Sequence, residues 1–243
     1  MNKRSKLAFT LAITLPFIGS AQAGSWGYSA KDGPEHWGHV SATCSEGKNQ
    51  SPVDIRSAQL VDAQLQPLEF HYQGKVANVV NNGHTVQVNI TGDNTLMLDG
   101  QVFELKQFHF HTPSENTFNG KHAPLEAHFV HANVNGELAV VAVMFKSGER
   151  EDSELADILH TLPATDQTID IESNLALANL LPRVKTYYRY NGSLTTPPCS
   201  EGVRWIVLTD PQFINQGQLE NLSKTMGHNA RPTQAQNARL ILK

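Results

Sequence analysis

The sequence predicts a single domain built mainly from β-strands. Short runs rich in branched and aromatic residues recur along the chain, and turn sequences such as Asn82-Gly83 and Asp99-Gly100 separate them. The 243 residues are 40% hydrophobic and 17% charged, which is typical of a globular protein. No internal repeat, low-complexity run or linker divides the chain. We therefore expect one all-β domain.

Residues 1–23 stand apart from this domain. Three basic residues precede an apolar run at residues 7–18, which is too short to span a bilayer, and Ala21-Gln22-Ala23 has the pattern of a cleavage site. These features are typical of a secretory signal peptide. We expect a mature domain at residues 24–243 without a membrane segment, located in the periplasm or secreted.

The charge of the mature chain argues against a nucleic-acid partner. Cleavage after Ala23 would remove three basic residues and no acidic ones, so the net charge would change from −4 to −7 with histidine counted as neutral. A net negative chain without a basic cluster lacks the electrostatic surface that binds phosphate backbones. The sequence gives no indication of the oligomeric state.

The chain has two cysteines, Cys44 and Cys199. In an exported protein an even number favours a disulfide over two free thiols. Neither cysteine belongs to a C-x-x-C motif, which argues against a redox centre or a zinc site with cysteine ligands. A bridge across so long a loop would contribute at most about 5 kcal/mol in the chain-entropy account of disulfides.

The first half of the chain holds most of the predicted strands. Residues 24–48 lack periodicity and are expected to form an irregular arm, anchored by Trp26 and Trp37. Beyond this arm, strands are predicted at residues 68–72, 76–80, 85–90, 95–98, 101–111, 125–133 and 138–145. The last of these is apolar on both faces, so we expect a central strand that is covered on both sides.

The second half mixes helices and strands. Apolar residues with helical spacing predict helices at residues 153–162, 174–181 and 216–226. Strands are predicted at residues 187–191 and 203–208, and residues 229–243 are expected to be mostly extended.

A group of histidines in the predicted sheet indicates a metal site. Side chains alternate in a strand, so His109 and His111 share a face, and His128 and Glu126 share a face of the strand that follows. An H-x-H pair alone is common among ordinary histidines. Three histidines with an open fourth position are typical of catalytic zinc, whereas structural zinc usually has four protein ligands. Gln107 and Glu126 are placed to orient neighbouring imidazoles.

These segments, together with Ser114-Glu115-Asn116 and residues 193–199, resemble the α-class carbonic anhydrases. Further segments of the resemblance are residues 50–55, 81–84, 205–208 and 229–232. They follow the order of the family from about Trp26 to near the C-terminus. The predicted signal peptide at residues 1–23 indicates that the resemblance is to exported bacterial members of the family.

The resemblance implies a twisted, largely antiparallel ten-stranded sheet with short peripheral helices and zinc at the foot of a conical cleft. It implies a lyase that reversibly hydrates carbon dioxide to bicarbonate and a proton, with His109, His111 and His128 as zinc ligands. Three neutral imidazoles leave zinc its full charge, so a bound water is strongly acidified; carbonic anhydrase is itself the standard example of this effect.

The resemblance also implies roles around the metal. Thr195 would accept a hydrogen bond from the zinc-bound hydroxide that attacks the substrate and would donate one to Glu115. Thr196 would lie near bicarbonate. The apolar wall for carbon dioxide would consist of Val130, Val140, Leu194, Val203 and Trp205. From the sequence alone, residues 195–198 would equally suit an ordinary turn and the five apolar residues an ordinary core.

His84 matches the family's proton shuttle. Rapid turnover needs a nearby group that titrates near neutrality, and histidine is such a group. Without the family, His84 would be taken for a solvated turn histidine. Tyr28, Asn82 and Gln87 match the positions that hold the water chain, although asparagine is common where Gln87 stands. Cys44 and Cys199 match a disulfide of exported members that would tether the loop bearing Thr195.

The alternatives to this function are a binding module and a different zinc hydrolase. A catalytically silent family member used as a binding module would typically lack a zinc histidine. A different zinc hydrolase, such as an esterase, would need a substrate cleft and a separate general base, and the sequence shows no motif for either.

Overall fold

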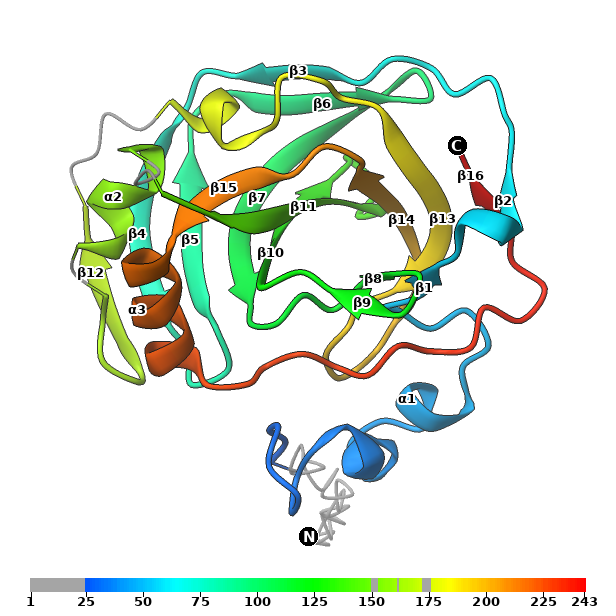
Figure 1. Ribbon diagram of the computed structural model, residues 1–243, viewed down its shortest axis with the longest axis horizontal. Coiled ribbons are helices and arrows are strands. Elements are labelled where there is room, and N and C mark those ends of the chain that lie inside the picture. Colours follow the sequence, from blue (N-terminus) through cyan, green and yellow to red (C-terminus); the bar gives the residue numbers. More distant parts are fainter. Residues whose placement is uncertain (1–24, 150–152, 161, 172–175) are drawn as a thin grey trace, which may run out of the picture.

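A computed structural model describes residues 25–149, 153–160, 162–171 and 176–243 (Figure 1). The predicted signal peptide lies outside these residues. Within the described ranges, no helix combines the length and the apolar character needed to cross a bilayer.

A large twisted sheet forms the body of the molecule (Figure 1). Its path of ten strands runs in the order β12 (Gln167–Asp170), β4 (Lys75–Asn81), β5 (Val86–Thr91), β7 (Gln101–His111), β10 (Leu125–Ala132), β11 (Leu138–Gly148), β14 (Glu201–Leu208), β13 (Tyr187–Ser193), β16 (Ile241–Leu242) and β2 (Leu60–Val61). Most neighbours are antiparallel, whereas β11 and β14 are parallel, as are β16 and β2. The predicted fold class is confirmed.

Several short strands complete the sheets, and the sequence predicted only two of them. These strands are β3 (Glu69–Tyr72), β6 (Asn94–Leu98), β15 (Gln212–Asn215), β1 (Asp54–Ile55), β8 (Thr117–Phe118) and β9 (Lys121–His122). The first three extend the large sheet, and the other three form a small sheet of their own. Strands of two to five residues show little periodicity, so the local pattern is a weak signal for them: β3 and β6 are predicted, whereas β1, β8, β9 and β15 are not.

The sheet has apolar packing on both sides of β11. Val141, Val143 and Phe145 belong to the larger core cluster, whereas Val140 and Met144 belong to a second cluster on the opposite face. Each of these side chains is buried. This arrangement confirms the central strand predicted from the run of apolar residues. Burial of one such side chain stabilises the fold by about 1.5–3 kcal/mol.

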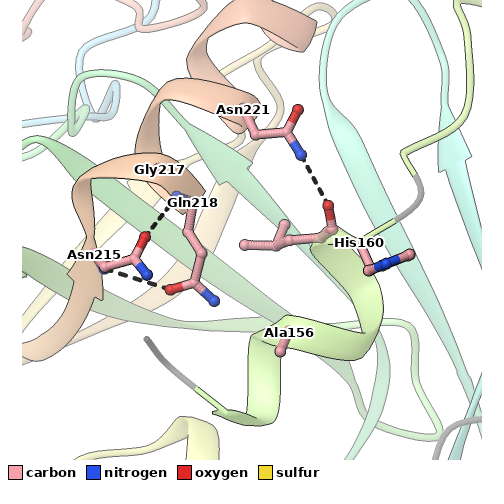
Figure 2. Close-up of a pocket in the computed structure, with 7 residues that line it drawn as sticks. Ala156, His160, Asn215, Gly217, Gln218 and Asn221 are labelled. Carbon is pink, nitrogen blue, oxygen red and sulfur yellow. Dashed lines mark hydrogen bonds between the residues drawn. The ribbon is translucent and has the colours of Figure 1, made fainter. Parts of the chain in front are cut away.

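Two helices, α2 (Ser153–Leu159) and α3 (Gln216–Met226), lie beside β4, β5 and β12 (Figure 1). The Asn221 amide donates a hydrogen bond of 2.8 Å to the carbonyl of Leu159, which joins the two helices (Figure 2). Asn215 caps α3 by accepting a 2.7 Å bond from the amide of Gln218.

The predicted helices agree with the structure to different degrees. The bounds of α3 agree with the prediction, whereas α2 ends three residues before the predicted position. Of the helix predicted at residues 174–181, the described part contains a 3-10 turn, η3 (Leu177–Leu180).

The N-terminal arm is more regular than predicted. It contains a 3-10 helix, η1 (Pro34–His39), and one α-helical turn, α1 (Thr43–Glu46), and a 3-10 turn η2 (Ser57–Gln59) follows β1. A proline in the first turn favours a helix start because its φ angle is already suitable. Trp37 is fully buried and donates to the carbonyl of Gly27 at 3.0 Å, so it anchors the arm as expected.

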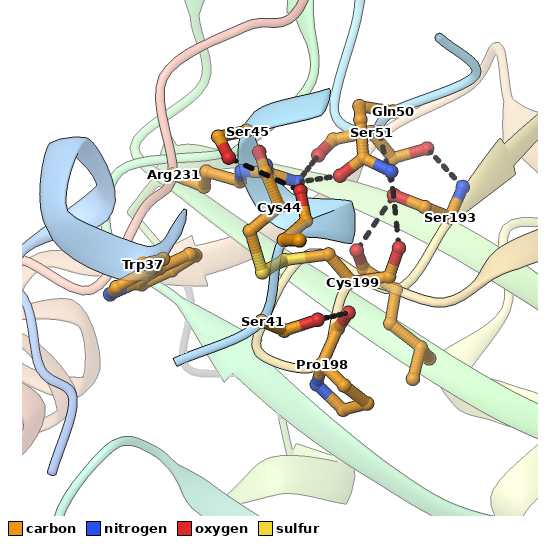
Figure 3. Close-up of a disulfide and its surroundings, with 12 residues drawn as sticks. Trp37, Ser41, Cys44, Ser45, Gln50, Ser51, Ser193, Pro198, Cys199 and Arg231 are labelled. Atoms are coloured by element: carbon orange, nitrogen blue, oxygen red, sulfur yellow. Dashed lines mark hydrogen bonds between the residues drawn. A yellow bond between two sulfur atoms is a disulfide. The ribbon is translucent and has the colours of Figure 1, made fainter. Parts of the chain in front are cut away.

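The predicted disulfide between Cys44 and Cys199 is present (Figure 3). It joins α1 to the loop after β13, across 155 positions of sequence. The hydroxyl of Ser41 donates to the carbonyl of Pro198 at 3.0 Å, which adds a second link between the same two segments. The loop that contains Thr195 is therefore attached to the N-terminal arm.

His131 is a buried histidine on the core side of β10. Its Nε2 lies 2.6 Å from the hydroxyl of Tyr72, and its Nδ1 lies 2.9 Å from the carbonyl of Phe129. Burial lowers the pKa of His131 to about 4, because a charged imidazole would lose its hydration there. These contacts give His131 a structural role in the core.

The low pKa of His131 predicts a pH dependence of stability. The folded pKa lies below the ordinary value of 6.5, so the unfolded chain binds more protons between pH 6.5 and 4. The free energy of unfolding should fall as the pH decreases through this window, by up to about 3 kcal/mol from this group. His131→Asn cannot titrate, so its loss of stability over the window should be smaller by that amount. Urea unfolding of both proteins with a chelator present, at several pH values, checks this; parallel pH profiles would contradict it.

Candidate metal centre

The three histidines of the predicted metal site come together because β7 and β10 pair in a particular register. His128 lies opposite His109, and Glu126 lies opposite His111, in an antiparallel ladder. One nitrogen of each histidine lies within 4.8 Å of the corresponding nitrogens of the other two. This antiparallel pairing places all three imidazoles on one face of the sheet.

Hydrogen bonds orient two of the imidazoles. Nδ1 of His109 lies 2.8 Å from Oε1 of Gln107, which leaves its Nε2 to face the other histidines. Nδ1 of His111 lies 2.8 Å from the carbonyl oxygen of Asn229. Nε2 of His111 is buried and has no hydrogen-bond partner among the described residues. A buried nitrogen without a partner is costly in a folded protein unless it binds something.

His128 has the opposite orientation. Its Nε2 lies 3.0 Å from Oε1 of Glu126, without the geometry of a regular hydrogen bond. Because Nε2 faces Glu126, Nδ1 is the nitrogen left for a metal. Glu126 is held firmly in place. It accepts bonds from the backbone amides of Glu115 and Asn116 at 2.6 and 2.9 Å, and from the Asn116 side chain at 2.7 Å.

The electrostatics of the three imidazoles favour a bound cation. Burial lowers the pKa of His109 and of His128 well below the ordinary value, and lowers the pKa of His111 as well. The rings are therefore neutral and offer nitrogen lone pairs. Three converging neutral imidazoles with a carboxylate behind one of them fit a divalent cation such as zinc.

Glu115 is a fully buried carboxylate beside the histidines. Its oxygens lie 3.5 Å from Nδ1 of His111 and 3.8 Å from Nδ1 of His128, and Oε1 accepts a 2.9 Å bond from the amide of Arg231. Burial raises the pKa of Glu115 to about 8, against the lowering effect of hydrogen bonding to Arg231 and Thr195. A divalent cation at the histidines would also lower this pKa, since it stabilises a nearby negative charge.

The contact between Glu115 and Thr195 is close but not fully formed. The Thr195 side chain is nearly buried and acts as a hydrogen-bonding group toward Glu115. Oε2 of Glu115 nevertheless lacks a hydrogen bond of regular geometry within the described part of the chain.

A small cavity of about 140 Å³ opens beside the imidazoles. It brings together His109 and His111 with most residues expected to bind water or carry protons, and the lining includes Trp26, Tyr28, Asn82, His84, Gln87, Thr196 and Gln107. Four other cavities among the described residues, including the one between α2 and α3 in Figure 2, have none of the three histidines in their lining.

His84 lies in the wall of this cavity. Its ring stacks on Trp26 with 3.7 Å between the centroids and 9° between the planes. Partial burial lowers the pKa of His84, against the opposing effect of Asp166 and Asp32. Asn82 holds the turn, because its Oδ1 accepts the backbone amides of His84 and Thr85 at 3.0 and 2.9 Å.

The five residues expected to form an apolar wall lie together. Val140, Val203 and Trp205 are members of the second core cluster, and Val130 and Leu194 pack against it. The indole of Trp205 lies 4.8 Å from the His128 ring, centroid to centroid. An apolar surface therefore borders the metal centre on the side of His128.

Two residues with a large part in this site had no predicted role. Asn229 accepts from His111 through its main chain, while its side chain accepts the amide of Thr112 and donates to the carbonyl of His84 at 3.0 Å. The buried guanidinium of Arg231 donates to the carbonyls of Cys44 and Ser51 and to the side chain of Gln50 (Figure 3). The segment at residues 229–232 matched the family, but the sequence contained no sign of these contacts.

Comparison with known proteins agrees with this geometry. A profile of the eukaryotic-type carbonic anhydrase family matches residues 32–243. A carbonic anhydrase from Pectobacterium carotovorum is 45% identical over 245 residues, which cover 98% of this chain and 99% of the relative.

Two solved bacterial structures have the same fold. The α-carbonic anhydrase of Photobacterium profundum superposes with a TM-score of 0.87 at 57% identity, over 90% of this chain and 100% of its own. The enzyme of Thermovibrio ammonificans, solved as a complex with the inhibitor sulfanilamide, gives 0.88 at 50% identity, over 90% and 99%. This chain belongs to the eukaryotic-type, or α, carbonic anhydrase family, whose enzymes hydrate carbon dioxide.

We expect the three converging histidines to bind one divalent metal ion, and zinc serves as the probe. His111→Ala removes a buried nitrogen that points at the other two rings, so it should weaken zinc binding by more than about 100-fold, since loss of a residue behind a ligand already costs about 10- to 100-fold. Competition with a chromophoric chelator measures the affinity. The exposed His71, replaced by alanine, is the control and should bind as the parent does. Equal affinities for His111→Ala and the parent would rule out this site.

Proposed function

We propose that the protein is a zinc enzyme that reversibly hydrates carbon dioxide to bicarbonate and a proton. The observation that carries this proposal is the convergence of three neutral imidazoles, two buried and one half-buried, beside an apolar wall. The site contains all three histidines, so the binding module that would lack one is not favoured. No specific feature of the described residues favours another hydrolase.

His109, His111 and His128 would hold the ion through Nε2, Nε2 and Nδ1 respectively. When bound, zinc supplies a Lewis acid that acidifies water, for which carbonic anhydrase is the standard example. Gln107 and the carbonyl of Asn229 fix the ring orientations through the other nitrogens. Prearranged rings need no reorganisation when the ion binds.

Thr195 and Glu115 would orient the attacking oxygen. A threonine hydroxyl can donate to Glu115 and at the same time accept a hydrogen bond from the reacting group. Oε1 of Glu115 accepts the amide of Arg231, and Oε2 has no hydrogen-bond partner among the described residues, so Oε2 is available to accept from Thr195. The hydrogen-bonded series from Thr195 through Glu115 to the backbone amide of Arg231 would then set the direction of the attacking lone pair.

The apolar wall would take the substrate. Carbon dioxide has no strong dipole and offers little for hydrogen bonds, so contact with apolar side chains suits it better than a polar pocket. Trp205 is held for this purpose by a 3.0 Å bond from Nε1 to the carbonyl of Ser193. Thr196, which lines the polar cavity on the other side, would contact the bicarbonate product.

His84 would carry the released proton to solvent. It is partly exposed, lines the cavity that contains His109 and His111, and stacks on Trp26. Tyr28, Asn82 and Gln87 line the same cavity and would hold the water molecules between the metal centre and His84.

We also propose export to the periplasm by cleavage of residues 1–23, which leaves the domain at residues 24–243. The disulfide between Cys44 and Cys199 supports a compartment outside the reducing cytoplasm.

The central experiment is a stopped-flow assay of carbon dioxide hydration with a pH indicator. We expect a rapid rate that falls to the uncatalysed rate after zinc is removed with a chelator and returns when zinc is added back. Sulfanilamide, which the Thermovibrio ammonificans structure contains, should inhibit the zinc-loaded protein by binding at the metal. A zinc-loaded, folded protein without a rate above background would overturn the proposal.

The shuttle makes a separate prediction. His84→Ala should lower kcat in weak buffer by about 10- to 100-fold, at or below the lower end of what a positioned acid–base group contributes. The ratio kcat/KM should stay within about twofold, because His84 does not contact the substrate. Added imidazole should restore kcat by taking the proton directly. A variant that imidazole does not rescue would show that His84 has another role.

A further inference from the structure

Three amide side chains form a continuous chain that begins in the cavity beside the metal centre. Nε2 of Gln87 donates to Oδ1 of Asn89 at 2.7 Å, and Nδ2 of Asn89 donates to Oδ1 of Asn78 at 2.7 Å. Gln87 and Asn89 share one face of β5 because they are two residues apart. Asn78 lies directly opposite Asn89 on β4. The chain therefore runs from the cavity across two strands.

Gln87 is the member of the chain that reaches the cavity. It lies opposite His109 in the pairing of β5 with β7, and it lines the cavity together with His84. Its NH2 group is turned toward Asn89, so the carbonyl oxygen is the free end of the amide. In the described ranges, no group donates a hydrogen bond to this oxygen. A hydrogen-bond acceptor is thus available on a residue that lines the same cavity as His109 and His84.

The orientation of this amide matters because its two ends have opposite polarity. A water that passes a proton toward His84 gains positive charge as it does so. A carbonyl oxygen stabilises that charge, whereas an NH2 group in the same place destabilises it. An amide that rotated freely would present both ends, and preorganisation would be lost.

The hydrogen bonds of Asn89 and Asn78 oppose a flip of the Gln87 amide. If Gln87 alone turned over, its oxygen would face Oδ1 of Asn89, and two acceptors would meet. Restoring the hydrogen bonds would require Asn89 and Asn78 to turn as well. The three amides thus reorient only as a unit, which makes a single flip of Gln87 unfavourable.

We propose that Asn89 and Asn78 are positioning residues that hold the Gln87 carbonyl oxygen toward the proton path between the metal centre and His84. The proposal rests on the proposed carbonic anhydrase activity and adds two residues that have no place in the cavity lining. It also gives a reason for glutamine at position 87, since the longer side chain spans the distance from the cavity to Asn89.

The test uses the full mature protein loaded with zinc. Asn89→Leu removes both hydrogen bonds and should lower kcat in weak buffer by about tenfold or less, a barrier change of at most about 1.4 kcal/mol. The ratio kcat/KM should not change, and imidazole should restore kcat, because it bypasses the internal path. Asn89→Asp can only accept from Gln87, so it should keep the orientation and kcat close to the parent's values.

A double-mutant comparison shows whether Asn89 acts through Gln87. In a Gln87→Leu background there is no amide to orient, so Asn89→Leu should have no further effect on kcat. Additive effects, or an unchanged kcat in Asn89→Leu, would overturn the proposal while leaving the proposed function intact. A general structural fault would lower kcat/KM and resist imidazole, which would also overturn it. An inactive parent protein would overturn the proposed function and this proposal together.

Discussion

The register between β7 and β10 is the constraint on which the metal centre depends. A slip of one residue would turn every side chain of one strand to the opposite face and separate His128 from His109. The core prevents that slip. Phe108 and Phe129 lie opposite each other on the buried face, with parallel-stacked rings 5.0 Å apart, and both are almost completely buried. Hydrophobic packing on one face therefore specifies coordination geometry on the other.

The second constraint is a buried polar network drawn from distant parts of the chain. Asn116 holds Glu126, Asn229 holds His111, and Arg231 connects Glu115 to the arm that contains Cys44. Each of these groups is buried, so the loss of any one would leave others without partners. The network explains how loops, and not the sheet alone, can hold side chains rigidly around the site.

Periodicity in the sequence was enough to predict the parts of the structure that repeat. It predicted the bounds of β7 and α3 and the shared face of His109 and His111. It could not predict contacts between segments that have no period, such as the bond between His111 and the carbonyl of Asn229, which are 118 positions apart. The helical turns of the arm and the shortest strands were missed for the same reason, because their form depends on tertiary partners rather than on local pattern.

The contact between His111 and Asn229 also has a consequence for how the protein is made. Ribosomes make the chain from its N-terminus, and Asn229 follows His111 by 118 positions. The bond that orients His111 therefore cannot form until residue 229 has been made, and the contact of Arg231 with Gln50 spans 181 positions in the same way. Contacts between such distant residues tend to slow folding. The β7–β10 ladder can therefore pair before the hydrogen bond that fixes His111 is in place.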